Sequence, residues 1–308
     1  MARIVITGVA GCIGSWVARH LLDAGHEVVG VDVADRFPNA ARLGLEGVAV
    51  ERLDVAERER FAQFLRGAAP AGIVHLVSLL MPTCRARPGL CVDINVQSFM
   101  TVLEVARELD CSVAYASSAW VQKPPPDDRL VEEGDGIEPQ SLYGVFKLAN
   151  EGMARLYARD YGVRCNGLRP YIVYGPGREG GLTADINLAL LAAARGEPYE
   201  IGFGGTVALH HASDVAALFA RLALAPTAAG RVYNVRGTVC TMTEVVAAID
   251  DVTGTRGLVS FRDAPLPIAA NLSDAALQRD YGPLEFMDLR EGMAATLALH
   301  RATGGTGG

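Results

Sequence analysis

The feature that most constrains the fold is a set of glycines near the start of the chain. A short β-branched segment, residues 3–7, is followed by glycines at every third position, Gly8, Gly11 and Gly14. Apolar residues then recur with helical spacing from Ile13 until the chain reaches Gly25. This order predicts a strand, a tight turn and a helix, an arrangement that binds the pyrophosphate of a dinucleotide. The spacing is G-x-x-G-x-x-G rather than G-x-G-x-x-G, and the alternative is an ordinary strand–helix turn.

The second strand ends in an acidic residue that supports dinucleotide binding. Residues 28–31 are typical of a buried strand, and Asp32 follows about 18 residues after the last glycine, where a carboxylate binds the ribose hydroxyls of adenosine. A carboxylate at this position would repel a 2′-phosphate, so we expect NAD rather than NADP. Arg36 is the one nearby residue that would weaken this preference.

A second informative pattern places a tyrosine and a lysine on one helix. The segment from Ser141 to Tyr161 has a helical pattern that carries Tyr143 and Lys147, which would leave the same face about one turn apart. An ammonium beside a phenol lowers the pKa of the phenol, which suits it to proton transfer near neutral pH. This spacing is common in ordinary helices. It indicates a proton-transfer pair only together with the glycines and with a serine-ended strand at residues 112–118.

Strand and helix patterns alternate through the first two thirds of the chain. Further strands are expected at residues 48–51, 72–78 and 163–174, and such alternation predicts a parallel sheet covered by helices on both faces. We therefore expect an α/β fold, a Rossmann-type doubly wound parallel sheet, with a smaller, mixed α/β C-terminal substrate lobe. The expected boundaries are a dinucleotide-binding domain at 1–175, a substrate lobe at 176–300 from which a strand near 232–235 could return to the main sheet, and a disordered tail at 302–308.

The bulk properties exclude several classes of protein. The chain has 308 residues and a formal net charge of −7, which argues against nucleic-acid and anionic-membrane partners. No apolar run approaches the length of a membrane span, and because the first residues already have a strand pattern we expect no signal peptide. The six cysteines form no C-x-x-C pair, so we expect no metal and a reducing, cytoplasmic location.

Motifs along nearly the whole chain resemble one known family. They are Thr7-Gly8-x-x-Gly11-x-x-Gly14, Asp32, Asp54-Val55, His75-Leu76, Asn95, Ser117-Ser118, Tyr143-x-x-x-Lys147, Arg169-Pro170, Tyr174-Gly175-Pro176, Ser213-Asp214-Val215 and Tyr233-Asn234-Val235. The chain is thereby similar to the extended short-chain dehydrogenase/reductase family, also called the NAD-dependent epimerase/dehydratase family.

The resemblance implies roles for individual residues. It implies a catalytic set of Ser118, Tyr143 and Lys147, with Ser118 preferred over Ser117 because it lies three residues before Val121, as in the S-x-x-V pattern of the family. It further implies that NAD is held by Gly8, Gly11, Ile13, Gly14, Asp32, Asp54, Val55, Leu76, Val77, Ser78, Tyr143, Lys147, Pro170, Tyr171 and Ile172.

Departures from the family patterns narrow the expected chemistry. Dehydratases of the family carry an Asp-Glu pair where this chain has Ala119 and Trp120, so elimination of water is not expected. Sugar-nucleotide enzymes commonly have Asn at the position of Ile172 and a phosphate-binding arginine in the strand where residues 205–209 have none. Candidate substrate residues are Ser78, Leu80, Ser118, Trp120, Arg178 and His210, with a solvated Arg178, a core His210 and a core Trp120 as alternatives.

Three functions remain open from the sequence. The first is an NAD-dependent dehydrogenase that acts on a secondary alcohol of a small polar substrate, such as a sugar, a sugar acid or a hydroxy or amino acid. The second is a nucleotide-sugar epimerase that retains NAD, and the third is a cofactor-sensing binding protein. Carbohydrate metabolism is the expected context for an enzyme of this kind. The resemblance also implies a homodimer formed through the helical segments at 92–109 and 141–161.

Overall fold

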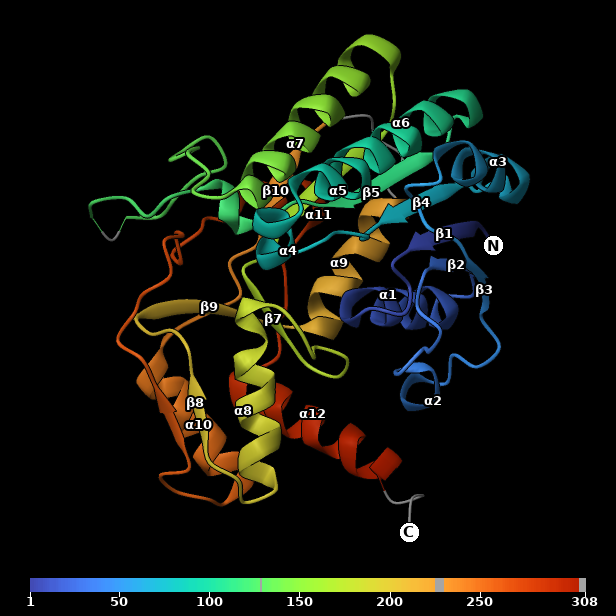
Figure 1. The fold of residues 1–308 in the computed structure, drawn as a ribbon. Helices are drawn as coiled ribbons and strands as arrows, with labels where there is room; N and C mark the ends of the chain where they lie inside the picture. The colour runs from blue at the N-terminus through green and yellow to red at the C-terminus, as the bar shows by residue number, and fades with distance from the viewer. Residues whose placement is uncertain (128, 225–229, 305–308) are drawn as a thin grey trace.

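A computed structural model describes residues 1–127, 129–224 and 230–304. Its centre is a seven-stranded sheet with strand order β10-β6-β5-β4-β1-β2-β3, and every neighbouring pair is parallel (Figure 1). In chain order these strands are β1 (Arg3–Thr7), β2 (Glu27–Asp32), β3 (Ala49–Arg52), β4 (Gly72–His75), β5 (Ser112–Ala116), β6 (Cys165–Arg169) and β10 (Val232–Asn234). The order reverses between β1 and β4, and a crevice that accepts a dinucleotide is typical of that point.

Helices cover both faces of this sheet, which confirms the doubly wound fold. One face carries α3 (Arg58–Ala68), α6 (Ser98–Leu109) and α7 (Leu142–Tyr161), and the other carries α1 (Cys12–Asp23) and α9 (Ala212–Leu224) (Figure 1). Side chains alternate along β1 accordingly: Ile4 and Ile6 join the apolar cluster beneath α1 and α9, whereas Val5 joins the cluster beneath α3 and α6. Strands buried on both faces explain the nearly continuous apolar runs in the sequence.

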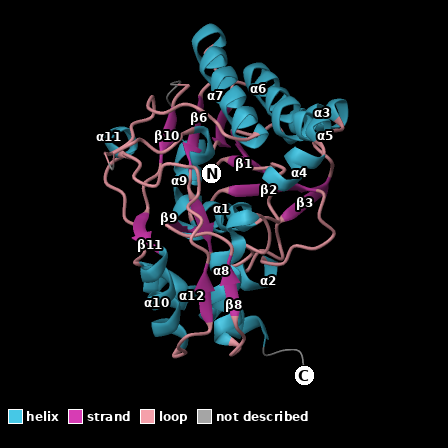
Figure 2. Ribbon diagram, turned by 60° about the vertical axis from the view of Figure 1, so that its left-hand side comes forward, coloured by secondary structure: helices cyan, strands magenta, loops and turns pink. Residues whose placement is uncertain are grey.

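A smaller lobe adjoins the carboxyl ends of these strands. Figure 2 shows α8, α10 and α12 gathered around β8 at some distance from the seven-stranded sheet. The lobe contains a three-stranded sheet, β11-β9-β7, with one antiparallel and one parallel pair, and a two-stranded parallel sheet, β12-β8. Its elements are β7 (Ile172–Tyr174), α8 (Asp185–Ala194), β8 (Tyr199–Ile201), β9 (Thr206–His211), β11 (Thr238–Thr241), α10 (Met242–Thr253), β12 (Val259–Phe261) and α12 (Leu289–Gly304). Shorter helices elsewhere are α2 (Ala40–Leu43), α4 (Met81–Ala86), α5 (Pro88–Val92) and α11 (Ala275–Tyr281).

The chain crosses between the two parts more often than a boundary at residue 175 suggests. Within 176–300, β10 pairs with β6 in the main sheet, and α9 packs against α1 and β5. The reason is the apolar face of α9, where Val215 and Phe219 are fully buried in the cluster shared with β1. Residues 302–304, expected in a disordered tail, form the end of α12, because the helix continues past Leu297, which is buried in the smaller lobe. The rest of the expected tail, 305–308, lies outside the described residues.

The helical run from Pro88 to Leu109 departs from the expectation that no segment approaches a membrane span. By length and composition it is long and apolar enough to cross a membrane, and half of the window that qualifies is buried inside the protein. The run is made of α5, a π-helical turn (Asp93–Gln97) and α6, and Phe99, Val102 and Leu103 of α6 pack beneath the sheet. A core helix of this kind passes the same test of length and composition.

Candidate active site

The loop after β1 has a shape that only glycine permits. Gly8 adopts φ of +76°, which is a left-handed conformation. A Cβ added at Gly14 would lie 2.1 Å from the Gly8 carbonyl oxygen, so α1 begins in direct contact with the loop. Gly11 caps α1 without a side-chain hydrogen bond, which leaves the amide groups of its first turn to other partners. The loop and the first turn of α1 therefore fit a pyrophosphate, because free amide groups and the helix dipole stabilise an anion bound there.

Asp32 lies beside this loop at the end of β2. Its carboxylate accepts hydrogen bonds from the amides of Ala10 and Ala34, both at 3.0 Å, which fixes its position. A pocket of about 440 Å³ opens here and also includes Arg36. It brings together eight of the residues expected to hold NAD, with Asp32, Asp54 and Val55 expected at the adenosine: Gly8, Gly11, Asp32, Asp54, Val55, Leu76, Val77 and Ser78.

The segment that follows β4 is held by an asparagine on the π-helical turn. The Asn95 amide donates to the Leu79 carbonyl at 2.9 Å and accepts from the Leu79 amide at 2.7 Å. Asn150 of α7 in turn donates to the Asn95 carbonyl at 2.8 Å. π-helical turns often occur at functional sites, and this one ties the wall formed by Ser78 and Leu80 to the helix that carries Tyr143.

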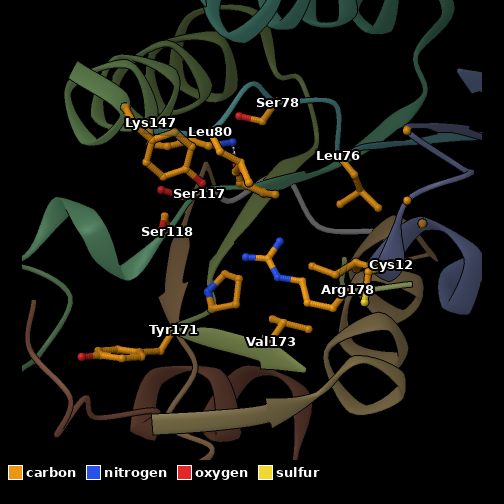
Figure 3. A pocket seen from close by; sticks show the side chains of 17 residues that line it. Cys12, Leu76, Ser78, Leu80, Ser117, Ser118, Lys147, Tyr171, Val173 and Arg178 are labelled. Atoms are coloured by element: carbon orange, nitrogen blue, oxygen red, sulfur yellow. Dashed lines mark hydrogen bonds between the residues drawn. The ribbon is translucent and has the colours of Figure 1, made fainter. Parts of the chain in front are cut away.

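A second pocket, of about 260 Å³, joins the glycine loop to the expected catalytic residues (Figure 3). Lys147 donates to the Ala116 carbonyl at 2.7 Å, and its nitrogen lies 5.5 Å from the centre of the Tyr143 ring. Ser118 and Tyr143 line this pocket together. The predicted residues that line this pocket are Gly8, Gly11, Ile13, Gly14, Leu76, Ser78, Leu80, Ser118, Tyr143, Lys147, Pro170, Tyr171 and Arg178.

The electrostatics differ from the expectation that Lys147 lowers the pKa of Tyr143. Burial raises the pKa of Tyr143 above its usual value, and the groups that oppose this rise are Ser118 and Arg178. Burial also lowers the pKa of Lys147 to about 8, against smaller opposing effects of Cys84 and Glu151. The physical reason is that both partners are desolvated, which disfavours the phenolate and the ammonium alike.

Two expected site residues point elsewhere. Ile172 lines neither of these two pockets and is fully buried in the core of the smaller lobe, because side chains alternate along β7 and the next residue, Val173, lines the larger pocket instead. His210 is 1% exposed and packs against Gly237 and Phe286, away from the pocket. Burial lowers its pKa to about 3, so it is a neutral core histidine.

A third, smaller pocket continues from Tyr143 toward the smaller lobe. Its volume is about 70 Å³, and it contains Ser118, Trp120 and Arg178 among the residues predicted for substrate binding. Its remaining walls are mostly apolar and come from Leu80, Met81, Pro82, Tyr171, Leu182 and Thr183. An alcohol bound here would lie against the Ser118 and Tyr143 hydroxyls.

The sequence interpretation did not single out several residues of these pockets. Cys12 and Val173 line the larger pocket, while Met81, Pro82, Leu182 and Thr183 line the smaller one. Ser117, which the sequence interpretation set aside in favour of Ser118, also lines the larger pocket. Alternation from Tyr171 could have identified Val173. The residues around 182 enter through a loop and a short 3₁₀ turn (Leu182–Ala184), for which no periodic signal exists. Within the described ranges, no cluster of three or more His, Cys, Asp or Glu side chains could hold a metal ion.

Comparison with known proteins gives consistent results. Residues 4–235 match the model of the NAD dependent epimerase/dehydratase family. An uncharacterized 37.6 kDa protein from the cld 5′ region of Escherichia coli O111:H- is 34% identical over 188 residues, which cover 56% of this chain and 55% of that protein. The chain thus spans about half the length of the curated relatives it matches.

Two solved structures are similar over nearly the whole chain. MoeE5 in complex with UDP-glucose and NAD has a TM-score of 0.82 and 26% identity, covering 98% of this chain and 99% of that one. An L-threonine dehydrogenase from Clostridium difficile has a TM-score of 0.85 and 21% identity, covering 99% of both chains. The second similarity concerns the fold alone.

Proposed function

The chain belongs to the NAD dependent epimerase/dehydratase family and is an NAD-dependent enzyme, and we propose that it is a dehydrogenase. It would transfer a hydride between NAD and a secondary alcohol or ketone of a small polar substrate, such as a sugar, a sugar acid or a hydroxy or amino acid. The observation that carries this proposal is the small pocket of about 70 Å³ that opens directly beside Ser118 and Tyr143.

Different residues of the chain would have different roles in such a reaction. NAD supplies the hydride acceptor or donor when it is bound, and the glycine loop and Asp32 would hold it. The Ser118 hydroxyl would hydrogen-bond the reacting oxygen and Tyr143 would take or return its proton, since the two side chains line the same small pocket. Lys147, which donates to the Ala116 carbonyl, would remain within reach of the nicotinamide ribose.

The size of the pocket separates a small substrate from a nucleotide sugar. Sites for larger ligands usually measure about 300–1,000 Å³, several times the volume beside Tyr143. A diphosphate also needs cations or several donors to offset its lost hydration, and among the described residues Arg178 and Lys147 are the only cationic side chains that line these two pockets. Elimination of water is disfavoured as well, because Ala119 is fully buried and Trp120 carries no acidic group.

One observation favours a second candidate. MoeE5, 26% identical to this chain, is solved in complex with UDP-glucose and NAD, so a nucleotide-sugar epimerase that retains NAD is the alternative. Binding without catalysis, as in a cofactor sensor, is less consistent with Ser118, Tyr143 and Lys147 converging on one pocket.

The amount of NAD bound to the purified protein and the net reduction of NAD to NADH distinguish these functions. The purified protein is first assayed for bound NAD and is then screened with sugars, sugar acids and hydroxy acids for NADH absorbance at about 340 nm. We expect NADH to accumulate with a small alcohol and UDP-glucose to be unchanged. Interconversion of UDP-sugars with stoichiometric NAD and no net NADH would establish the epimerase instead.

Assembly and location are further parts of the proposal. We propose a homodimer formed through the helices around α6 and α7, because α7 leaves Leu142, Val145, Leu156 and Tyr161 more than a third exposed. A monomeric mass in light scattering would contradict this proposal. All six cysteines are free, which is consistent with the proposed cytoplasmic location.

A further inference from the structure

Arg178 has a backbone that is fixed from both sides. The buried Asn187 side chain donates to the Arg178 carbonyl at 3.0 Å and accepts from the Gly175 amide at 3.2 Å. The buried Asn39 side chain donates to the Pro176 carbonyl at 2.9 Å. The loop between β7 and α8 is therefore anchored to both α8 and the segment before α2, and Arg178 enters the site from a defined position.

The guanidinium of Arg178 has few partners of its own. It lines both the larger and the smaller pocket, and Figure 3 shows it extending toward the centre of the larger one, opposite Ser118 and Lys147. One nitrogen donates to the Thr183 hydroxyl at 3.0 Å, while Nε is buried without a hydrogen-bond partner. Among residues 1–127, 129–224 and 230–304, no carboxylate lies within ion-pair distance of it, in contrast to Arg262, which pairs with Glu200 at 2.8 Å.

The surroundings of Arg178 make an uncompensated cation costly. The walls of the smaller pocket beside the guanidinium include the apolar side chains of Leu80, Met81, Pro82 and Leu182. Apolar walls lower the local dielectric constant, which strengthens the attraction between the guanidinium and an anion. The buried Nε donor also loses its bond to water without replacement, so a ligand that accepts a hydrogen bond there is favoured.

We propose, building on the dehydrogenase function, that Arg178 binds a carboxylate of the substrate and that the substrates are small hydroxy acids. A carboxylate matches the planar, forked donors of a guanidinium. The volume of the pocket, about 70 Å³, is on the scale of a small hydroxy acid. Arg178 and Tyr143 line the same small pocket, so a carboxylate held by Arg178 would stand near an alcohol carbon beside Tyr143.

The test compares acids with their amides. Wild-type protein, Arg178→Gln and the matched control Arg262→Gln are assayed with a panel of 2- and 3-hydroxy acids of three to six carbons and with the corresponding amides. Wild type should prefer an acid over its amide by about 100-fold or more in kcat/KM, and Arg178→Gln should lose most of that preference, since a charged pair in a desolvated pocket contributes on this scale. The Arg262→Gln control, at an exposed pair outside the pocket, should keep it.

A second measurement separates a role in substrate binding from a role toward the cofactor. The affinity for NADH is measured by fluorescence titration and should be the same in wild type and Arg178→Gln. Lower NADH affinity in Arg178→Gln with an unchanged acid-to-amide ratio would overturn the proposal and assign Arg178 to the cofactor. Equal loss of activity with acids and amides would also overturn it, because a merely structural role predicts that result.

Failure of the dehydrogenase function remains distinguishable from failure of this inference. Binding of malate and tartronate to NADH-loaded protein is measured by calorimetry, without turnover. If wild type binds these acids and Arg178→Gln does not, the carboxylate site is supported even if no alcohol is oxidised. Oxidation of neutral alcohols that is unchanged in Arg178→Gln, without binding of either acid to wild type, would leave a dehydrogenase and remove the carboxylate site.

Discussion

Replacement of Glu151 by Gln tests how the end of β5, which is followed by Ser118, is joined to α7, which carries Tyr143 and Lys147. Glu151 lies on α7, one turn beyond Lys147, and accepts two hydrogen bonds from Arg169, at 2.8 and 2.6 Å. The Ser117 hydroxyl donates to the same carboxylate. The two charged side chains are only 7% and 3% exposed, so Glu151 and Arg169 hold α7, β6 and the end of β5 together out of contact with water.

The expected cost follows from this burial. Glu151→Gln keeps the volume but leaves Arg169 as a buried charge without its counter-ion, and breaking a buried pair in this way costs about 3–5 kcal/mol. At roughly 2 °C per kcal/mol for a chain of this size, Tm should fall by roughly 6–10 °C. The Glu151→Gln, Arg169→Met double variant should recover part of the loss, because it removes the unpaired charge together with its partner.

Urea unfolding followed by circular dichroism, together with calorimetry, measures this loss. The control is Glu108→Gln, which breaks an ion pair with Arg66 of similar geometry, at 2.6 and 2.9 Å, whose side chains are 41% and 47% exposed. An exposed pair contributes at most about 1 kcal/mol. Equal losses in the two single variants, or a change within about 0.5 kcal/mol for Glu151→Gln, would refute the reasoning from burial.

Three further predictions concern the cofactor and the pH dependence. Asp32→Ala should weaken NAD binding by about 10–100-fold, because a charge-assisted hydrogen bond to each ribose hydroxyl is lost; fluorescence titration checks this, and unchanged affinity would contradict the assignment. Gly14→Ala should abolish measurable NAD binding in calorimetry, since its Cβ would lie 2.1 Å from the Gly8 carbonyl oxygen and the glycine loop would have to open. Ketone reduction should stay level below pH 8 and decline above it, because the Lys147 ammonium, with its pKa lowered to about 8, is charged below that pH and neutral above it. In a pH–rate profile, Lys147→Met should be slow and should lack the decline above pH 8. The same decline in that variant would show that another group titrates there.

Much of the fold could be predicted because its signals are local and periodic. Strands buried on both faces leave apolar runs, and Gly8, Gly11 and Gly14 leave a turn that few other residues can form. The positions of α7 and β5 follow from such patterns to within one or two residues. The pockets likewise gather most residues inferred from the family motifs, since those motifs lie at the carboxyl ends of parallel strands.

The remaining features depend on packing that the sequence does not display. Ile172 is inferred from the family motif, and the motif does not show that β7 turns Val173 rather than Ile172 toward the pocket. The chain segment of α9 was assigned to the smaller lobe because chain order alone does not show which sheet a helix covers. The rise in the Tyr143 pKa results from burial, which spacing along one helix cannot measure.

The most direct test of the central claim is hydride transfer in Tyr143→Phe. Stopped-flow absorbance with the best alcohol from the screen is measured in wild type and in this variant at matched occupancy by NAD. Loss of a positioned proton acceptor should slow the reaction by about 10²–10⁴-fold, while the affinity for NAD stays close to that of wild type. Hydride transfer in the variant at the wild-type rate would show that Tyr143 is not the acid/base of this site.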